Sequence, residues 1–252
     1  MHPDSGSITG FVSKNGGKFE ISSVDGTELT LSAVESPPDG SDSCDTNVED
    51  QPGFDLANMT SNTTRSLSAA TAGSSISYQA EVAVDTDNEW MAGKGNNTTT
   101  AMNFITDIFL AMNVFFERDL ETRLVIGDVT LRTTTDPYSV ASGTSAQLDE
   151  FAEYWRINYG SVERDFAMMF SGRDIRHYYF SGIAWLNQYC QNGYSAGRRT
   201  VGSYSFNAIG AGRTAANTAA GVGHELCHNK GSAHTHCYSP AIDQCWAGEA
   251  GC

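Results

Sequence analysis

From residue 76 onward the apolar positions follow two different periods. Residues 76–84 carry apolar side chains at every second position, which predicts a half-buried strand. Residues 98–120 carry them at intervals of three and four, which predicts a long helix with one wide buried face. The apolar positions of this helix are Ala101, Met102, Ile105, Ile108, Phe109, Met112, Phe115 and Phe116.

The same two patterns recur to the end of the chain and define a fold class. Short apolar runs predict four further strands, and three- to four-residue spacing predicts two further helices. The strands are expected at 124–131, 166–170, 182–186 and 201–206, and the helices at 147–159 and 213–228. Strands that alternate with helices predict an α/β fold with a mixed, mainly parallel twisted sheet and long helices.

The first 75 residues have a different character. Residues 8–12, 19–24 and 29–34 read as short strands separated by glycine-containing turns, which predicts a small β unit. Residues 35–73 are rich in Pro, Asp, Ser, Thr and Asn and are expected to be a linker, because they offer little apolar surface to bury. We therefore divide the chain into a β-rich segment at 1–50, a flexible linker at 51–75 and a main domain at 76–252.

The predicted helix at 213–228 carries the candidate chemistry, in the sequence HELCHNKGSAH at 224–234. His224 and His228 stand four residues apart, so a helix places both imidazoles on one face, within reach of one metal ion. Glu225 lies beside the first of them and is the predicted general base, which takes a proton from a zinc-bound water. The two histidines and the carboxylate predict a hydrolytic zinc site.

A catalytic zinc needs a third protein ligand, and His234 is the predicted one. Gly231, midway between His228 and His234, can adopt the left-handed backbone that ends the helix and turns the chain back beneath the metal. The full spacing H-E-x-x-H-x-x-G-x-x-H is far more specific than its first half. Three alternative third ligands stay open at this point, namely His236, Asp243 and Glu249.

Charge and composition exclude some partners. Thirty acidic against fifteen basic residues give a formal net charge of −15, so no basic surface for nucleic acid is expected. We expect no segment that spans a bilayer, because such a segment needs a run of about 18 apolar residues. The six cysteines favour an oxidising, secreted setting, although residues 1–25 contain no signal peptide. We expect that the N-terminus is truncated.

Beyond the zinc motif, residues 76–252 resemble the reprolysin, or adamalysin-like, family of metzincin zinc proteases, in particular its bacterial members. The segments FSGRDI at 170–175, GIAW at 182–185 and HTHCYSP at 234–240 carry the resemblance. Cys227 and Thr235 depart from the family pattern, as does the lack of a methionine after His234. The resemblance implies that the chain is truncated before its methionine turn.

The resemblance also implies roles for two further groups of residues. Gly182, Ile183, Ala184 and Trp185 match the strand that lines the cleft and binds an extended peptide as an added strand. Residues 1–50 resemble the end of a propeptide, in which a cysteine thiolate fills the fourth zinc position and keeps the enzyme inactive. Cys44 is the candidate for this cysteine switch, with a disulfide as the alternative, and Arg65-Ser66 is a candidate processing point.

The sequence thus predicts a zinc metalloendopeptidase of the EC 3.4.24 type that hydrolyses internal peptide bonds of proteins and is made as a zymogen. Two alternatives remain open. The first is a zinc-stabilised binding or adhesion module without catalytic activity, and the second is an inactive fragment of a protease. An intact Glu225 argues against the first, because a purely structural zinc site closes the fourth position.

Overall fold

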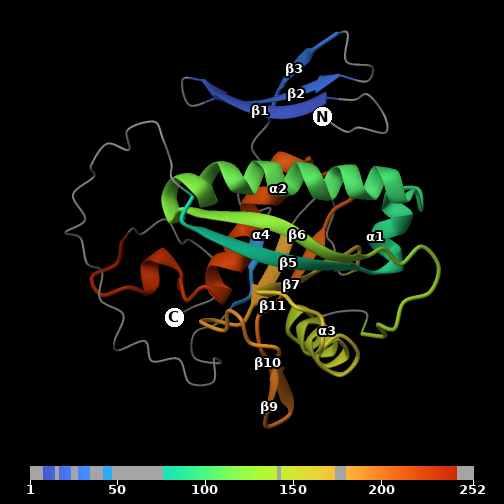
Figure 1. Cartoon of the computed structure of the whole chain (residues 1–252), viewed down its shortest axis with the longest axis vertical. Coiled ribbons are helices and arrows are strands. Elements are labelled where there is room, and N and C mark those ends of the chain that lie inside the picture. The colour runs from blue at the N-terminus through green and yellow to red at the C-terminus, as the bar shows by residue number, and fades with distance from the viewer. Residues whose placement is uncertain are drawn as a thin grey trace.

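The computed structural model describes residues 8–14, 17–23, 28–34, 42–46, 76–140, 143–173 and 180–242. Within these residues, the main domain consists of a central sheet between two helical layers (Figure 1). Helices α2 (Thr98–Leu120) and α4 (Ala215–Asn229) pack on one face, and α3 (Thr144–Asn158) packs on the other. The mixed, mainly parallel α/β sheet expected from the sequence is confirmed.

The central sheet ends on one side in strand β4 (Asp42–Cys44), which carries the candidate residue Cys44. Its six strands run in the order β4-β8-β11-β7-β5-β6. The pairs β5–β6, β5–β7, β7–β11 and β4–β8 are parallel, and only β8–β11 is antiparallel. The strands are β4 (Asp42–Cys44), β5 (Tyr78–Thr86), β6 (Thr122–Thr130), β7 (Phe166–Ser171), β8 (Phe180–Ala184) and β11 (Tyr204–Ile209).

The two-residue period of the central strands sends side chains into two separate cores. In β7, Phe166, Met168 and Phe170 pack towards α2 and α4, while Ala167 and Met169 pack towards α3. All six residues of β7 are buried, as are all six of β11. Strands covered on both faces read as continuous apolar runs, which explains why the run at 166–170 was recognisable in the sequence.

Helix α2 agrees with the predicted range. Asn97 caps it, because its side-chain oxygen accepts a hydrogen bond of 3.0 Å from the backbone N–H of Thr100. Its buried face includes Ile105, Ile108 and Met112. Among the described helices α2 alone is long and apolar enough to cross a membrane, by length and composition only, although no such window was expected. A core helix has the same two properties, so this finding is weak evidence for a span.

A small separate sheet precedes the main domain. Strands β1 (Ile8–Lys14), β2 (Gly17–Ser23) and β3 (Thr30–Ala33) form an antiparallel meander beside α2 (Figure 1). The three predicted strands are thus present. The proposed boundaries at residues 50 and 75, and the identity of the first segment as a propeptide, stay predictions.

The structure corrects the expectation that 35–73 is only a linker. Residues 42–44 form β4, which pairs with β8 at the edge of the main sheet. The segment gains its order from this pairing and not from its own apolar content, which is why composition did not reveal it. Residues 47–75, which include the candidate processing point at Arg65-Ser66, lie outside the described residues.

Other elements were absent from the sequence prediction. They are α1 (Asn88–Gly93), the hairpin of β9 (Tyr194–Ala196) and β10 (Arg199–Val201), and the short 3-10 helix η3 (Thr235–Cys237). The last sheet strand was expected at 201–206, whereas β11 spans Tyr204–Ile209. Polar residues interrupt this part of the chain, so the pattern of apolar residues alone does not fix where the strand begins and ends.

Candidate metal centre

Helix α4 holds the first two predicted ligands in place. Its N-cap is Thr214, whose side chain accepts a hydrogen bond of 3.2 Å from the backbone N–H of Asn217. One turn near its end carries His224 and His228, and their Nε2 atoms lie 2.9 Å apart. The Nδ1 atom of His228 lies 2.6 Å from the carbonyl oxygen of Ser232, so the ring donates to this carbonyl and turns Nε2 towards His224.

The turn after α4 brings His234 to the same place. Gly231 has a φ of +97°, and its N–H donates a 2.8 Å hydrogen bond to the carbonyl of His228. The N–H of Ser232 then donates to the carbonyl of Cys227 at 3.0 Å. These bonds end the helix as the sequence predicted for a glycine at this position. The ring centroid of His234 lies 5.3 Å from that of His224 and 4.8 Å from that of His228.

Cys44 joins these histidines from a distant part of the sequence. Its Sγ atom lies 3.4 Å from Nε2 of His228, and it is a free thiol with 7% of its surface exposed. The sequence predicted a linker around Cys44, whereas this residue lies in β4 and is buried against β8. The alternative of a disulfide at Cys44 is also excluded in this structure.

The four side chains form a candidate site for a metal ion. One nitrogen from each of His224, His228 and His234 and the sulfur of Cys44 all lie within 4.8 Å of one another. Zinc binds nitrogen at about 2.0–2.1 Å and thiolate sulfur at about 2.3 Å, so two ligands of one ion are separated by at most about 4.4 Å. The separations of 2.9 Å and 3.4 Å given above satisfy this limit.

The electrostatics of the centre favour the protonation state that a metal requires at His228, but not at Cys44. Burial, followed by the neighbouring His224, lowers the pKa of His228 to about 3, so its ring is neutral at pH 7. Burial and the carboxylate of Glu225 raise the pKa of the Cys44 thiol well above its ordinary value. A metal ion reverses this second effect, since a coordinating thiol loses its proton.

Glu225 lies beside the four candidate ligands and is fully buried. Its Oε2 atom is 3.8 Å from the sulfur of Cys44 and accepts a hydrogen bond of 3.5 Å from the Thr46 hydroxyl. Gly182 of β8 is needed for this placement, because a Cβ atom there would lie 2.3 Å from Oε1 of Glu225. The carboxylate thus sits between the candidate metal centre and the edge strand.

The comparison with known families agrees with this geometry. The profile of the metallo-peptidase family M12 (Reprolysin_5) matches residues 77–252. The chain belongs to this metallopeptidase family. A search of curated proteins found no match.

Two solved structures are similar to this metallopeptidase only at a low level. Metalloproteinase-II from Bacteroides fragilis has 10% identity and a TM-score of 0.43, over 90% of this chain and 66% of its own. A structure described as a chaperone-substrate complex has 16% identity and a TM-score of 0.43, over 61% of this chain and 26% of its own. The chain thus spans less than two thirds of either structure, and at these scores the likeness assigns no function.

In this metallopeptidase the predicted cleft strand has two kinds of residue. Gly182 accepts a 2.9 Å hydrogen bond at its carbonyl from the N–H of Asp45, and the N–H of Ala184 donates one of 3.0 Å to Thr46. The side chains of Ile183 and Trp185 are buried in the core beneath α3. Backbone atoms of Gly182 and Ala184 therefore bind Asp45 and Thr46, while the side chains of Ile183 and Trp185 belong to the core.

The alternative third ligands differ in how far the structure tests them. His236 stacks on His234 with a centroid separation of 5.3 Å, but the cluster around Cys44 contains His234 and not His236. A second group of His234, His236 and Cys237 also lies close together. Cys237 is disulfide-bonded, so its sulfur is no thiolate ligand there. Asp243 and Glu249 lie outside the described residues.

Proposed function

We propose that this M12 metallopeptidase is a zinc-dependent endopeptidase made as a secreted zymogen. One observation carries the proposal. Three histidines and a buried glutamate lie close to a thiol from a distant segment, in β4 at the edge of the sheet. A purely structural site would explain the ligands but not the buried carboxylate beside them. The endopeptidase class, the zinc and the secretion are proposals that go beyond the family assignment.

The three histidines His224, His228 and His234 would hold the zinc ion. Zinc bound there supplies Lewis acidity, which polarises the scissile carbonyl and acidifies the attacking water. The chain itself prepares the site, because the Ser232 carbonyl orients the ring of His228 and the pKa of this ring keeps it neutral at pH 7. Soft and nitrogen ligands together favour zinc over magnesium or calcium, which prefer oxygen.

Glu225 is the proposed general base of the reaction. Its carboxylate takes a proton from water as the oxygen attacks the carbonyl carbon of the peptide bond. The same proton is then passed to the amide nitrogen, which leaves as an amine when the C–N bond breaks. The full burial of Glu225 suits this role, since a fixed carboxylate need not reorganise during the reaction.

Gly182 and Ala184 are proposed to bind the main chain of the substrate. Their backbone groups at the edge of the sheet already bind Asp45 and Thr46 in this structure. An extended peptide that adds to this edge would be held by backbone hydrogen bonds without demand for one side chain. The scissile bond would then lie next to Glu225 and the histidines.

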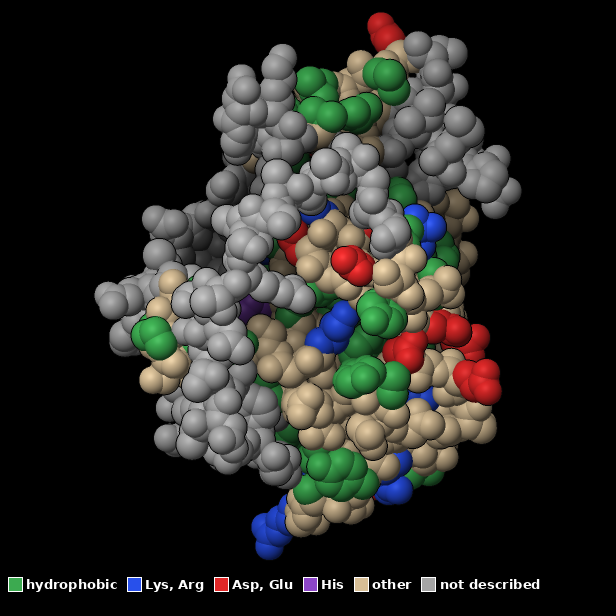
Figure 2. Space-filling model, turned by 60° about the vertical axis from the view of Figure 1, so that its left-hand side comes forward, with side chains coloured by type: hydrophobic (Ala, Val, Ile, Leu, Met, Phe, Trp, Pro, Cys, Tyr) green, Lys and Arg blue, Asp and Glu red, His purple; other side chains and the backbone are tan. Residues whose placement is uncertain are grey.

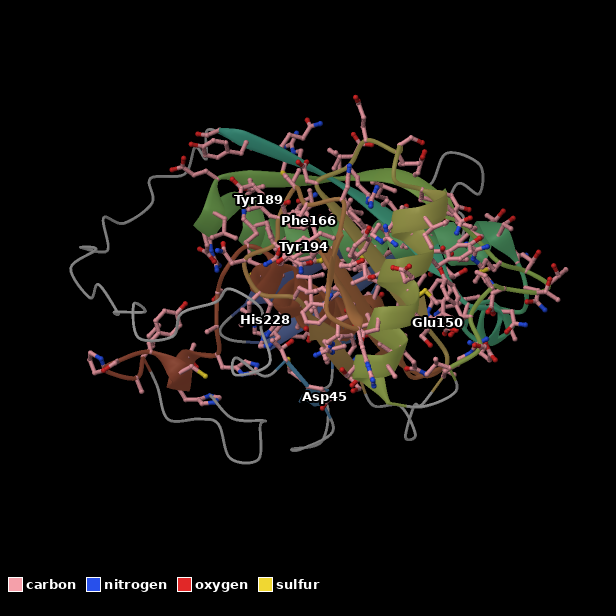
Figure 3. The ribbon with its side chains drawn as sticks, turned by 90° about the horizontal axis from the view of Figure 1, so that it is seen from below. Asp45, Glu150, Phe166, Tyr189, Tyr194 and His228 are labelled. Atoms are coloured by element: carbon pink, nitrogen blue, oxygen red, sulfur yellow. The ribbon has the colours of Figure 1, made fainter. Side chains whose placement is uncertain are left out.

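Cys44 is proposed to keep the enzyme inactive. Its sulfur lies among the histidines, and its strand covers the edge that the substrate needs. With zinc present, the thiolate would fill the position that water requires for catalysis. Figure 3, a view from below, labels His228 and Asp45, the neighbour of Cys44.

Removal of the metal tests the proposed chemistry. The chain, treated with a thiol-reactive reagent to release Cys44, is expected to cleave unfolded casein and to contain about one zinc per chain. A chelator should abolish cleavage. Added Zn²⁺ should restore it, because the three histidines can bind zinc again without Cys44. Zinc binding without any cleavage would instead favour the non-catalytic binding module.

A further inference from the structure

Asn229 makes contacts that neither the zinc ligands nor the general base require. It is the last residue of α4, it directly follows the candidate ligand His228, and none of its surface is exposed. Its Nδ2 atom donates hydrogen bonds of 2.7 Å to the carbonyl of Trp185 and 3.2 Å to the carbonyl of Tyr204. One side chain thus connects α4, which carries two candidate metal ligands, to the end of β8 and the start of β11.

These two carbonyls require a side chain with two N–H donors. The Nδ2 group of asparagine has two, and one can point to each carbonyl. The contacts also fix the orientation of the amide, because an oxygen placed 2.7 Å from the carbonyl oxygen of Trp185 would have no hydrogen to share. An aspartate of the same shape would repel both carbonyls, and an alanine would leave them without this donor in a buried place.

Two backbone hydrogen bonds join the same segments. The last carbonyls of a helix have no partner within the helix. At the end of α4 the carbonyl of His228 accepts a bond of 2.9 Å from the N–H of Asn187, and the carbonyl of Asn229 accepts one of 2.9 Å from the N–H of Gln188. The segment after β8 therefore covers the C-terminal end of α4, and the side chain of Asn229 strengthens this junction.

The junction links the two parts of the proposed active site. Backbone atoms of Gly182 and Ala184 in β8 are proposed to bind the substrate main chain, and Asn229 binds the residue that follows them. His228, the neighbour of Asn229, belongs to the candidate metal centre. Cys44 contacts both parts in this structure, because it pairs with Gly182 while its Sγ atom lies 3.4 Å from Nε2 of His228. A relative shift of β8 and α4 would break one of these contacts.

Asn229 is placed to act only through its neighbours. Figure 2 shows a histidine side chain (purple) at the surface of one face of the molecule, whereas Asn229 is completely buried. Its two side-chain hydrogen bonds go to backbone carbonyls and not to a candidate metal ligand or to Glu225. Any effect of Asn229 on the reaction therefore comes from the position of β8 relative to α4.

We propose that Asn229 is a positioning residue that holds the substrate-binding strand β8 at a fixed offset from the zinc ligand His228. This inference rests on the proposed function, because it takes β8 as the strand that binds the substrate. The fixed offset would bring the scissile carbonyl to the metal and to Glu225 in one geometry. A shift of about 1 Å between β8 and α4 is expected to lower the rate about 100-fold.

Steady-state kinetics on a quenched fluorescent peptide test the proposal in the zinc-loaded Cys44→Ala chain. Asn229→Ala should lower kcat about 10- to 100-fold and leave KM within about threefold, because the backbone groups of β8 that bind the peptide are unchanged. The zinc content should stay at about one per chain. Asn229→Asp keeps the size of the side chain but replaces the donor by an acceptor, so it should lose at least as much kcat.

Asn113→Ala is the matched control. Asn113 joins α2 to β6 in a similar way, since its Nδ2 atom donates a bond of 2.9 Å to the carbonyl of Leu124 and its Oδ1 atom accepts one of 2.8 Å from the N–H of Leu124. The control should lose thermal stability, as Asn229→Ala does, but keep its kcat. Equal losses of kcat in the two variants would overturn the proposal, as would an unchanged kcat in Asn229→Ala. If both Asn229 variants fail to fold while Asn113→Ala folds, the role of Asn229 is structural and the proposal also fails.

Thiol labelling of Cys44 provides a second measurement that needs no turnover. In the metal-free chain with Cys44 intact, Asn229→Ala should speed this labelling about tenfold, because Cys44 then no longer keeps its contacts with both β8 and His228. Asn113→Ala should label at the rate of the unaltered chain. The rates are measured by mass spectrometry of the peptide that contains Cys44.

The two measurements separate this inference from the proposed function. If neither the Cys44→Ala chain nor any variant of it cleaves a peptide, the proposed function fails. The labelling rate then still decides whether Asn229 fixes β8 relative to α4. Labelling that is unchanged in Asn229→Ala, or equally fast in Asn113→Ala, would overturn the inference whatever the enzyme does.

Discussion

Replacement of Glu225 by glutamine is expected to lower the rate of peptide cleavage by about 10²- to 10⁴-fold and to leave zinc bound. Glutamine preserves the size of the side chain but cannot take a proton from water. Because none of the three histidines changes, the zinc content should stay at about one per chain. The measurement is kcat on a quenched fluorescent peptide, together with zinc analysis of the same sample.

Glu163→Gln provides a matched control with the same change of charge. Glu163 is exposed and lies between α3 and β7, so this variant should retain its activity. Undiminished cleavage by the Glu225→Gln variant would contradict the proposed role of Glu225. Loss of zinc from this variant would mean that the glutamate acts on the metal site and not as a base.

Replacement of Cys44 by alanine is expected to raise the activity of the untreated chain at least about tenfold. The estimate follows from a latent form that holds about 99% of the sites closed and opens when the thiolate is lost. Thr46 still binds Ala184 and Glu225, so the release should be incomplete until the segment is removed. Initial rates before and after treatment with a thiol reagent measure this effect.

Cys190→Ala is the control for Cys44→Ala. Cys190 is an exposed free thiol that donates a hydrogen bond of 3.0 Å to Asp165, and it does not belong to the candidate metal cluster. Its replacement should leave the untreated chain as inactive as before. Equal activities of the Cys44→Ala and unaltered chains, with equal zinc contents, would show that the thiol does not cause latency.

Local patterns explain the parts of the fold and site that the sequence predicted. The range of α2 was predictable because its apolar period and its cap at Asn97 both lie within a few residues. The placement of His224 and His228 follows from helix geometry alone. Gly231 was recognisable because few other residues tolerate its φ of +97°. Each of these features depends on neighbours in the sequence.

The parts that could not be predicted depend on contacts between distant residues. Strand β4 has no apolar period and is ordered by pairing with β8, which lies more than 130 residues away in the sequence. The roles of Asp45 and Thr46 follow from this pairing, and a polar segment gave no signal for them. The resemblance to a propeptide implied a cysteine switch at Cys44, but it did not predict the burial of this residue.

X-ray absorption at the zinc edge of the untreated, zinc-loaded chain tests the central claim most directly. The account predicts three nitrogen ligands at about 2.0–2.1 Å, from His224, His228 and His234, and one sulfur at about 2.3 Å from Cys44. The sulfur signal should disappear in the Cys44→Ala variant and be replaced by an oxygen or nitrogen ligand. A spectrum of the unaltered chain without sulfur, or one that does not change in Cys44→Ala, would contradict the proposed latent zinc site.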